Sequence, residues 1–79
     1  MAKKGLSTYD KKFYNNLLMV AQNIMYTYSI EVPSLQFLAA MMDMPFSDAW
    51  INAFNRFKRS DKGIVKKTRD GYWVEVIPF

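Results

Sequence analysis

Apolar and polar positions are separated most clearly in segment 46–59. Four apolar residues of this segment fall within about 100° of one another on a helical wheel: Trp50, Ala53, Phe54 and Phe57. Polar residues occupy the opposite side of the wheel: Asp48, Asn52, Asn55 and Arg59. The pattern predicts an amphipathic helix over 47–60 that begins at the N-cap Ser47. We expect its apolar side to pack in the core.

A longer apolar stripe precedes this helix. Its members follow one another at helical spacing: Phe13, Leu17, Val20, Ala21, Ile24 and Tyr28. Ser7, followed by Asp10 at the third position after it, is typical of a helix start. The spacing therefore predicts a first helix over 7–28, with residues 1–6 flexible.

Two proline residues mark the boundaries between the helices. Pro33 disfavours helix at Val32, so segment 29–32 is expected to be short and extended, and able to pair with a later hairpin. Ser34 can cap a second helix over 34–44, which Pro45 ends. The residues of this helix that are expected to face inward are Leu35, Leu38, Ala39 and Met42.

The C-terminal part of the chain has the pattern of a β-hairpin. Segments 64–68 and 72–77 are rich in β-branched and aromatic residues, and Asp70-Gly71 between them is a strong turn signal. A two-residue turn at Asp70-Gly71 would place Lys66 opposite Glu75, a favourable pair of opposite charges. The sequence thus predicts a hairpin over 64–77 and a single domain over 1–79. The fold class is α+β, mainly α, with three helices and a C-terminal hairpin.

The composition agrees with a dense core. The chain has 79 residues, of which 51% are hydrophobic and 16% aromatic, and this argues against intrinsic disorder. Trp73 is expected to join Trp50, Phe54 and Phe57 in the core. Cysteine is absent, which fits a reducing compartment, and no apolar run approaches the roughly 20 residues of a membrane span. We therefore expect a cytoplasmic protein that is not embedded in a membrane.

The net charge of +4 is distributed unevenly along the chain. Residues 13–55 contain neither Lys nor Arg, whereas residues 56–69 contain seven such residues and only Asp61 as an acid. Separation of this kind favours a polyanionic partner. A charged surface that maintains solubility is the alternative interpretation.

The order of a long helix, an extended link, a helix, a tight turn, a helix and a basic hairpin resembles the winged helix-turn-helix family. The resemblance covers roughly residues 34–77. It is carried by Leu38-Ala39-Ala40, the turn Asp43-Met44-Pro45-Phe46, the spacing of Trp50, Phe54 and Phe57, the segment Lys62-Gly63-Ile64-Val65, and the hairpin Lys66-Lys67-Thr68-Arg69-Asp70-Gly71-Tyr72. The chain departs from the family pattern at Asp43-Met44, where a glycine is common, and at the acidic Asp48. The resemblance implies a small transcriptional regulator that binds duplex DNA.

Nine residues have side chains suited to DNA contacts. Asn52 and Asn55 can each pair with adenine, and Arg56 or Arg59 can pair with guanine. The lysines near the end of the third helix and the bases of the hairpin are suited to phosphate contacts: Lys58, Lys62, Lys66, Lys67 and Arg69. In this hypothesis the third helix enters the major groove, the hairpin contacts the flanking backbone, and bound protein blocks or recruits polymerase.

The composition and the apolar positions also bear on catalysis and on protein binding. Neither His nor Cys is present, no glycine-rich phosphate loop occurs, and the carboxylates are scattered, so we expect no catalysis, cofactor or metal. The competing hypothesis is a protein-binding inhibitor or adaptor on the same scaffold. Its surface would be the apolar first helix and the residues after it, which would also serve a homodimer: Tyr14, Met19, Met25, Tyr26 and Tyr28. A bare domain suits a compact viral or mobile-element regulator, which would act in the host cytoplasm.

Overall fold

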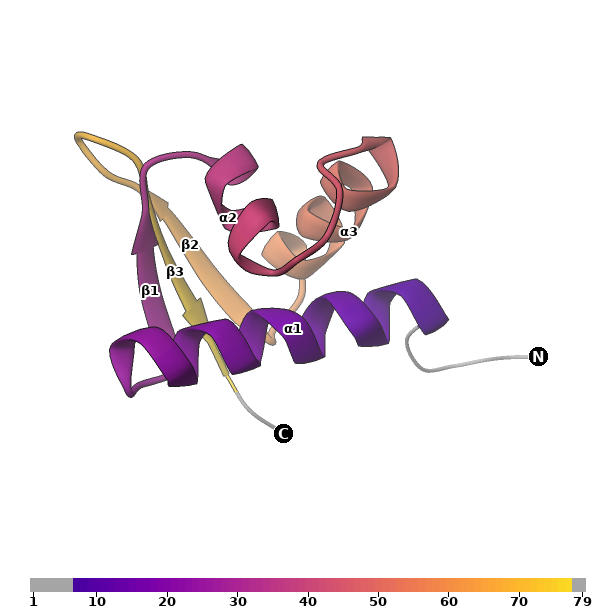
Figure 1. The fold of residues 1–79 in the computed structure, drawn as a ribbon, viewed down its shortest axis with the longest axis horizontal. Coiled ribbons are helices and arrows are strands. Elements are labelled where there is room, and N and C mark those ends of the chain that lie inside the picture. Colours follow the sequence, from indigo (N-terminus) through magenta and orange to yellow (C-terminus); the bar gives the residue numbers. More distant parts are fainter. Residues whose placement is uncertain (1–6, 78–79) are drawn as a thin grey trace.

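The computed structural model describes residues 7–77, with the side chains of residues 24 and 25 excepted. It contains three helices and three strands (Figure 1): α1 Thr8–Met25, β1 Ser29–Val32, α2 Leu35–Met41, α3 Asp48–Arg59, β2 Gly63–Lys67 and β3 Tyr72–Val76. The predicted class, α+β and mainly α, is confirmed. The expected flexibility of residues 1–6 lies outside the described residues.

The three strands form one antiparallel sheet in the order β1-β3-β2. The extended segment 29–32 is β1, and it pairs with β3 from Ser29 opposite Glu75 to Val32 opposite Tyr72. The sheet lies on one side of the molecule, and α1 runs below α2, α3 and the strands (Figure 1). The hairpin strand β2 follows α3 directly and packs beside it.

Each helix begins at a serine that caps it. The hydroxyls of Ser7, Ser34 and Ser47 each accept a hydrogen bond from a backbone N–H in the first turn of the helix, over 3.1 to 3.3 Å. The first helix ends at Met25 rather than at Tyr28, because Tyr26 adopts a left-handed conformation with φ of 57°. The chain can then turn back, and the Tyr28 carbonyl accepts a hydrogen bond from the Val76 N–H.

Asp43 takes the place of a glycine in the turn between α2 and α3. Its φ is 59°, a left-handed conformation that aspartate tolerates better than most residues. The N–H of Asp43 donates to the Ala40 carbonyl and that of Met44 to the Ala39 carbonyl, each over 3.0 Å. This pair of bonds is a Schellman motif, which ends α2 at Met41 rather than at residue 44.

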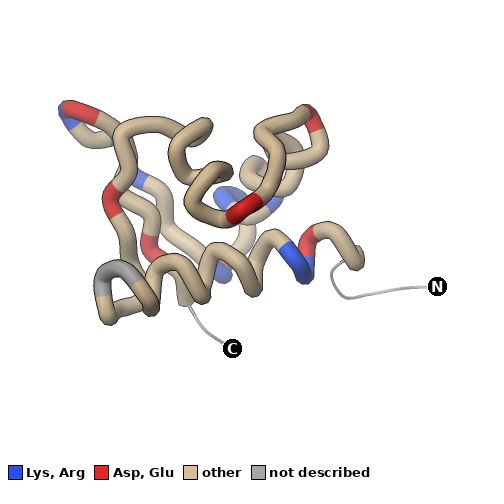
Figure 2. Tube along the Cα trace, viewed as in Figure 1, with Lys and Arg blue, Asp and Glu red and all other residues tan. Residues whose placement is uncertain are grey.

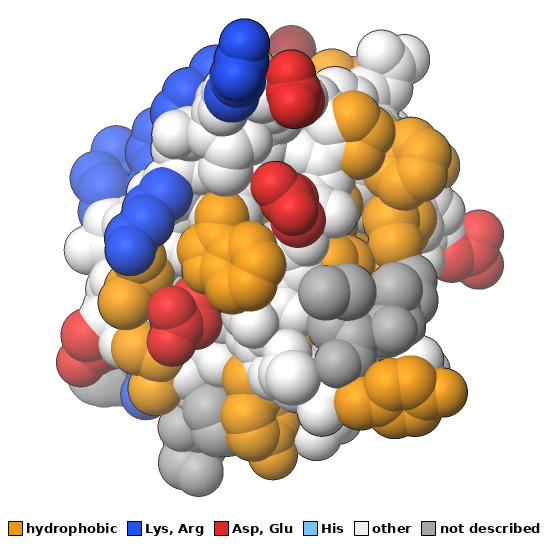
Figure 3. Space-filling view, turned by 90° about the vertical axis from the view of Figure 1, so that its left-hand side faces the viewer, with side chains coloured by type: hydrophobic (Ala, Val, Ile, Leu, Met, Phe, Trp, Pro, Cys, Tyr) orange, Lys and Arg blue, Asp and Glu red, His pale blue; other side chains and the backbone are white. Residues whose placement is uncertain are grey.

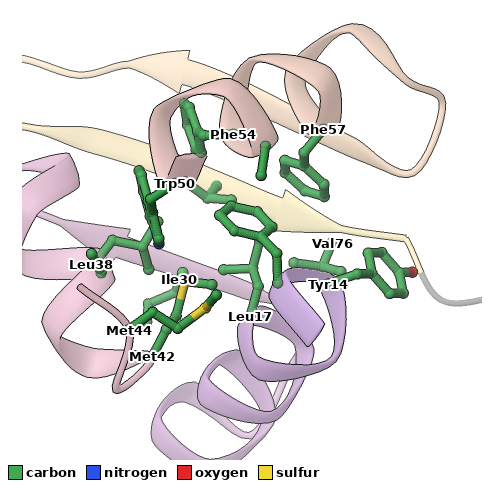
Figure 4. Packing of buried hydrophobic residues seen from close by; sticks show 14 of the residues in the cluster. Tyr14, Leu17, Ile30, Leu38, Met42, Met44, Trp50, Phe54, Phe57 and Val76 are labelled. Atoms are coloured by element: carbon green, nitrogen blue, oxygen red, sulfur yellow. The ribbon is translucent and has the colours of Figure 1, made fainter. Parts of the chain in front are cut away.

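The core lies between the inner face of the sheet and the three helices. Its members come from all six elements and the turn before α3: Phe13, Tyr14, Leu17, Ala21, Ile30, Val32, Leu38, Ala39, Met42, Met44, Trp50, Ala53, Phe54, Phe57, Val74, Val76 and the partly buried Val65. Figure 4 shows part of this cluster. The predicted rotation of α3 is confirmed, since all four residues of its apolar side are buried. The rings of Trp50 and Phe54 stack with centroids 5.5 Å apart. Tyr14 lies in this core, so its expected place on a partner-binding surface is wrong.

The hairpin has a different register from the predicted one. Lys67 lies opposite Tyr72, and the Thr68 N–H donates to the Gly71 carbonyl over 2.9 Å. The turn is therefore centred on Arg69-Asp70 instead of Asp70-Gly71, and the strands run from residue 63 to 76. The predicted pairing shifts by two residues as a result, which leaves each side chain on its predicted face of the sheet.

Close packing of two strands explains the shift. A Cβ atom on Gly71 would lie 2.1 Å from the Val32 carbonyl oxygen and 2.7 Å from the Pro33 Cα. The glycine is therefore needed where β1 passes the end of β3, and it does not form the tip of the turn. Glu75 consequently faces Ile64, and the predicted pair with Lys66 does not form.

Trp73 lies on the outer face of the sheet, and its expected place in the core is wrong. The ring is half-buried between Glu31 of β1 on one side and Lys66 of β2 on the other. Alternation along β3 explains this position, because Val74 and Val76 already point into the core.

Candidate nucleic-acid interface

A groove of about 250 Å³ runs between α3 and the hairpin. It exists because Ser60 ends α3 sharply: its N–H and its hydroxyl both donate to the Phe57 carbonyl, and its own backbone is extended. The Lys62 N–H then donates to the Ser60 hydroxyl over 3.1 Å, and the chain reverses into β2. The residues that line the groove are Leu35, Ile51, Phe54, Asn55, Lys58, Val65, Lys67 and Tyr72.

The groove is lined mainly by apolar residues, with a few polar side chains between them. Asn55 and Lys58 come from α3, and Lys67 comes from β2. The Lys67 Nζ atom lies 4.6 Å from the centre of the Tyr72 ring, a cation–π contact that holds the ammonium group beside the groove. Two ammonium groups and an amide thus line one groove, an arrangement suited to an anionic, hydrogen-bonding ligand.

The solvent side of α3 carries the other candidate readers. Asn52 and Arg59 are exposed and Asn55 is half-buried. Asp48 lies on the same side at the start of the helix. The side chains of Asn52, Asn55 and Arg59 form no hydrogen bond with another group of the described part of the chain, and so they are available to a ligand.

Arg56 borders the solvent side of α3, four positions after Asn52, but its side chain is engaged within the protein. Its Nε atom donates to Asp10 Oδ2 over 2.8 Å, and a terminal nitrogen donates to Asp10 Oδ1 over 2.7 Å. The hydrogen bond to Asp10 raises the pKa of Arg56 above its ordinary value. Arg56 thus ties α3 to α1. The two residues are 46 positions apart, and no local pattern in the sequence reveals their contact.

Lys62 lies near the same ion pair. It lines a small cavity of about 60 Å³ together with Asp10 and Arg56. Its backbone carbonyl accepts a hydrogen bond from the Ile77 N–H over 2.8 Å, which fixes the start of the hairpin. The structure therefore separates Arg56 and Lys62 from the groove residues.

The bases of the hairpin divide between the two faces of the sheet. Lys67 shares the inner face with Val65 and lines the groove, whereas Lys66 lies opposite Trp73 on the outer face. Arg69 is exposed in the turn. Of the nine residues suggested by the sequence, the groove contains three, Asn55, Lys58 and Lys67, and the adjacent solvent side of α3 adds Asn52 and Arg59.

Bases are concentrated in the hairpin and at the C-terminal end of α3, and two more, Lys11 and Lys12, lie near the start of α1 (Figure 2). Acids are spread over the turn before α3, the first residue of α3, the strands and the hairpin turn. Seen from the side of the sheet, Lys and Arg side chains gather along one edge, and acidic and hydrophobic side chains are interspersed over the rest of that face (Figure 3). A polyanion would therefore approach along the hairpin and the end of α3.

Sequence reasoning missed the apolar lining of the groove. Ile51, Val65 and Tyr72 contribute to it, and Ile51 is an exposed apolar residue on α3. The available signal was the helical wheel, on which Ile51 falls outside the apolar sector of Trp50 and its neighbours.

Among residues 7–77, no three His, Cys, Asp or Glu side chains are grouped so that they could hold a metal ion. No helix of the described part is long and apolar enough to cross a membrane. Comparison of the chain with protein-family models, with curated proteins and with solved structures gave no match.

Proposed function

We propose that this chain is a winged helix-turn-helix protein that binds duplex DNA and acts as a small transcriptional regulator. The observation that carries the proposal is the groove between α3 and the hairpin, where Asn55, Lys58 and Lys67 meet. The element order and the sheet order β1-β3-β2 support the winged-helix assignment, since they place a basic hairpin beside an exposed helix.

The proposed binding mode follows from the dimensions of the helix. With 12 residues, α3 is about 18 Å long, and the major groove of B-DNA is about 12 Å wide and admits an α-helix. Asn52 and Asn55 would pair with adenine and Arg59 with guanine. Lys58 and Lys67 would contact phosphates of the strand that runs beside α3. Bound protein would then block or recruit polymerase.

Two adjacent lysines on opposite faces of the hairpin test this mode. Binding to a short duplex is measured by fluorescence anisotropy over a range of salt concentrations for the wild type, Lys67→Ala and Lys66→Ala. Each phosphate contact contributes about 0.9 to the slope of log affinity against log salt. We expect Lys67→Ala to lower the slope by about that amount, and Lys66→Ala to lower it less, because Lys66 lies on the outer face of the sheet.

A distant charge provides the control. Lys12 is exposed on α1, and Lys12→Ala should leave the slope unchanged while removing the same unit of net charge. Failure of the wild type to bind duplex DNA even at low salt would contradict the proposal. Equal slopes for the three lysine variants would attribute binding to net charge alone, which would also contradict the groove as the site.

A second function is favoured by one observation. Tyr26 is 88% exposed and Met19 is 57% exposed, an unusual amount of free apolar surface on α1 and the residue after it. The alternative is therefore a protein-binding inhibitor or adaptor that uses this surface, or a homodimer through α1. Sedimentation velocity tests the homodimer, which is also compatible with DNA binding: a dimer that Met19→Glu disrupts would support an interface on α1, and a monomer at every concentration would argue against it.

A further inference from the structure

Ile51 is an exposed apolar side chain on the side of α3 that borders the groove. It is 36% exposed and lines the groove together with Asn55 and Lys58. Because Ile51 lies in the groove beside Asn55, it can contact an apolar group of a ligand that Asn55 binds, and removal of both groups from water is favourable. The apolar group that duplex DNA presents in its major groove is the methyl group of thymine.

We infer that Ile51 recognises a thymine methyl group and that the protein accordingly prefers duplexes rich in A·T pairs; this inference rests on the proposed function. Ile51 and Asn55 are four positions apart and lie on neighbouring parts of the helix surface. Along the helix axis they are separated by about 6 Å, or roughly two base-pair steps of about 3.4 Å. Asn55 pairs with adenine by its amide, and Ile51 contacts a thymine methyl group close by.

The surroundings of Ile51 fit a base edge better than a phosphate. Leu35, Phe54 and Val65 line the same groove and provide an apolar environment for a methyl group. Lys58 and Lys67 line the same groove as Ile51 and provide positive charge, which would attract the phosphates of the DNA strand that carries the thymine. The groove therefore combines an apolar contact for a base with cationic contacts for its phosphates.

The test compares two duplexes that differ only in the methyl group. One is built from A·T pairs, and the other has the same sequence with deoxyuridine in place of thymidine. Burial of one methyl group changes affinity by about fourfold, so we expect the wild type to bind the thymine duplex about fourfold more tightly. Ile51→Ala should bind the two duplexes equally, and Ile51→Val should retain most of the preference.

Ile64 provides the matched control. It is 42% exposed but lies on the outer face of the sheet opposite Glu75, so Ile64→Ala should keep the wild-type preference. Thermal unfolding of each variant shows whether the fold is retained. Equal binding of both duplexes by the wild type overturns the inference and leaves DNA binding intact. A preference that persists in Ile51→Ala overturns the assignment to this residue, whereas no binding to either duplex overturns the proposed function itself.

Discussion

The ion pair between Arg56 and Asp10 gives Arg56 a structural role that the proposed DNA-contacting Arg59 does not have, and Arg56→Ala tests this difference. The pair is bidentate, with Nε donating over 2.8 Å and a terminal nitrogen over 2.7 Å. The Arg56 side chain is 49% exposed and that of Asp10 is 14% exposed. Exposed ion pairs contribute about 0.2–1 kcal/mol, and hydrogen bonds to charged groups contribute about 1.5–3 kcal/mol when they are buried.

This half-exposed pair should contribute about 1 kcal/mol to the free energy of unfolding, because water screens the guanidinium group but reaches little of the carboxylate. For a domain of this size, that loss lowers the melting temperature by about 4–8 °C. Circular dichroism melts of Arg56→Ala, Asp10→Ala and the double variant give a coupling energy, which removes the separate effect of Asp10 on the start of α1.

Arg59 is the matched control for function, because it lies three residues further along α3 on the solvent side. Arg59→Ala should lower affinity for a preferred duplex by about 1–3 kcal/mol and barely change the melting temperature. Arg56→Ala should instead lower the melting temperature and barely change the affinity for the duplex. Should Arg56→Ala weaken DNA binding as much as Arg59→Ala does, or should its coupling to Asp10 be zero, the assigned role of the ion pair would be refuted.

Two further predictions concern the sheet and its anchor to α1. Gly71→Ala should destabilise the fold by about 1–3 kcal/mol, because the added Cβ would lie 2.1 Å from the Val32 carbonyl oxygen. Urea unfolding measures this loss, with Asp70→Ala in the exposed turn as the control. Equal urea midpoints for the two variants would contradict the prediction. Tyr14 donates a hydrogen bond to the Ile77 carbonyl over 2.5 Å, and burial raises the pKa of its phenol above the ordinary value. The neutral Tyr14 phenol therefore contributes its full stabilisation below the unfolded pKa of about 10, and this contribution is lost as pH rises through the folded pKa. Between neutral and alkaline pH, the melting temperature should therefore fall less steeply for Tyr14→Phe than for the wild type.

Periodicity was sufficient to predict the three helices and the buried side of α3, although α1 and α2 each end three residues before the predicted residue. The apolar residues of α3 differ from its polar residues by their angle around the axis alone, and all four are buried. Serine caps likewise act within one turn, and the hydroxyls of Ser7, Ser34 and Ser47 all accept the expected bonds. Local interactions of this kind can be read from a single sequence.

Two of the errors concern interactions between residues that are distant in sequence. The register of the hairpin depends on the approach of β1 to Gly71, and the turn signal alone favoured the wrong residues. The engagement of Arg56 depends on Asp10 of α1. The error at Trp73 has a local cause: hydrophobicity favours a core position, but alternation along β3 places Trp73 on the outer face opposite Lys66. The charge pattern of the sequence therefore indicates the segments of the candidate site, but it does not indicate which of their side chains line the groove.

A titration of isotopically labelled protein with a short A·T-containing duplex, followed by amide chemical shifts in NMR spectra, tests the central proposal most directly. The groove between α3 and the hairpin predicts the largest shifts at Ile51, Asn55, Lys58 and Lys67. It predicts small shifts at Asp10 and Met19 on α1. The largest shifts on α1, or no shifts at any ratio of duplex to protein, would contradict the proposal.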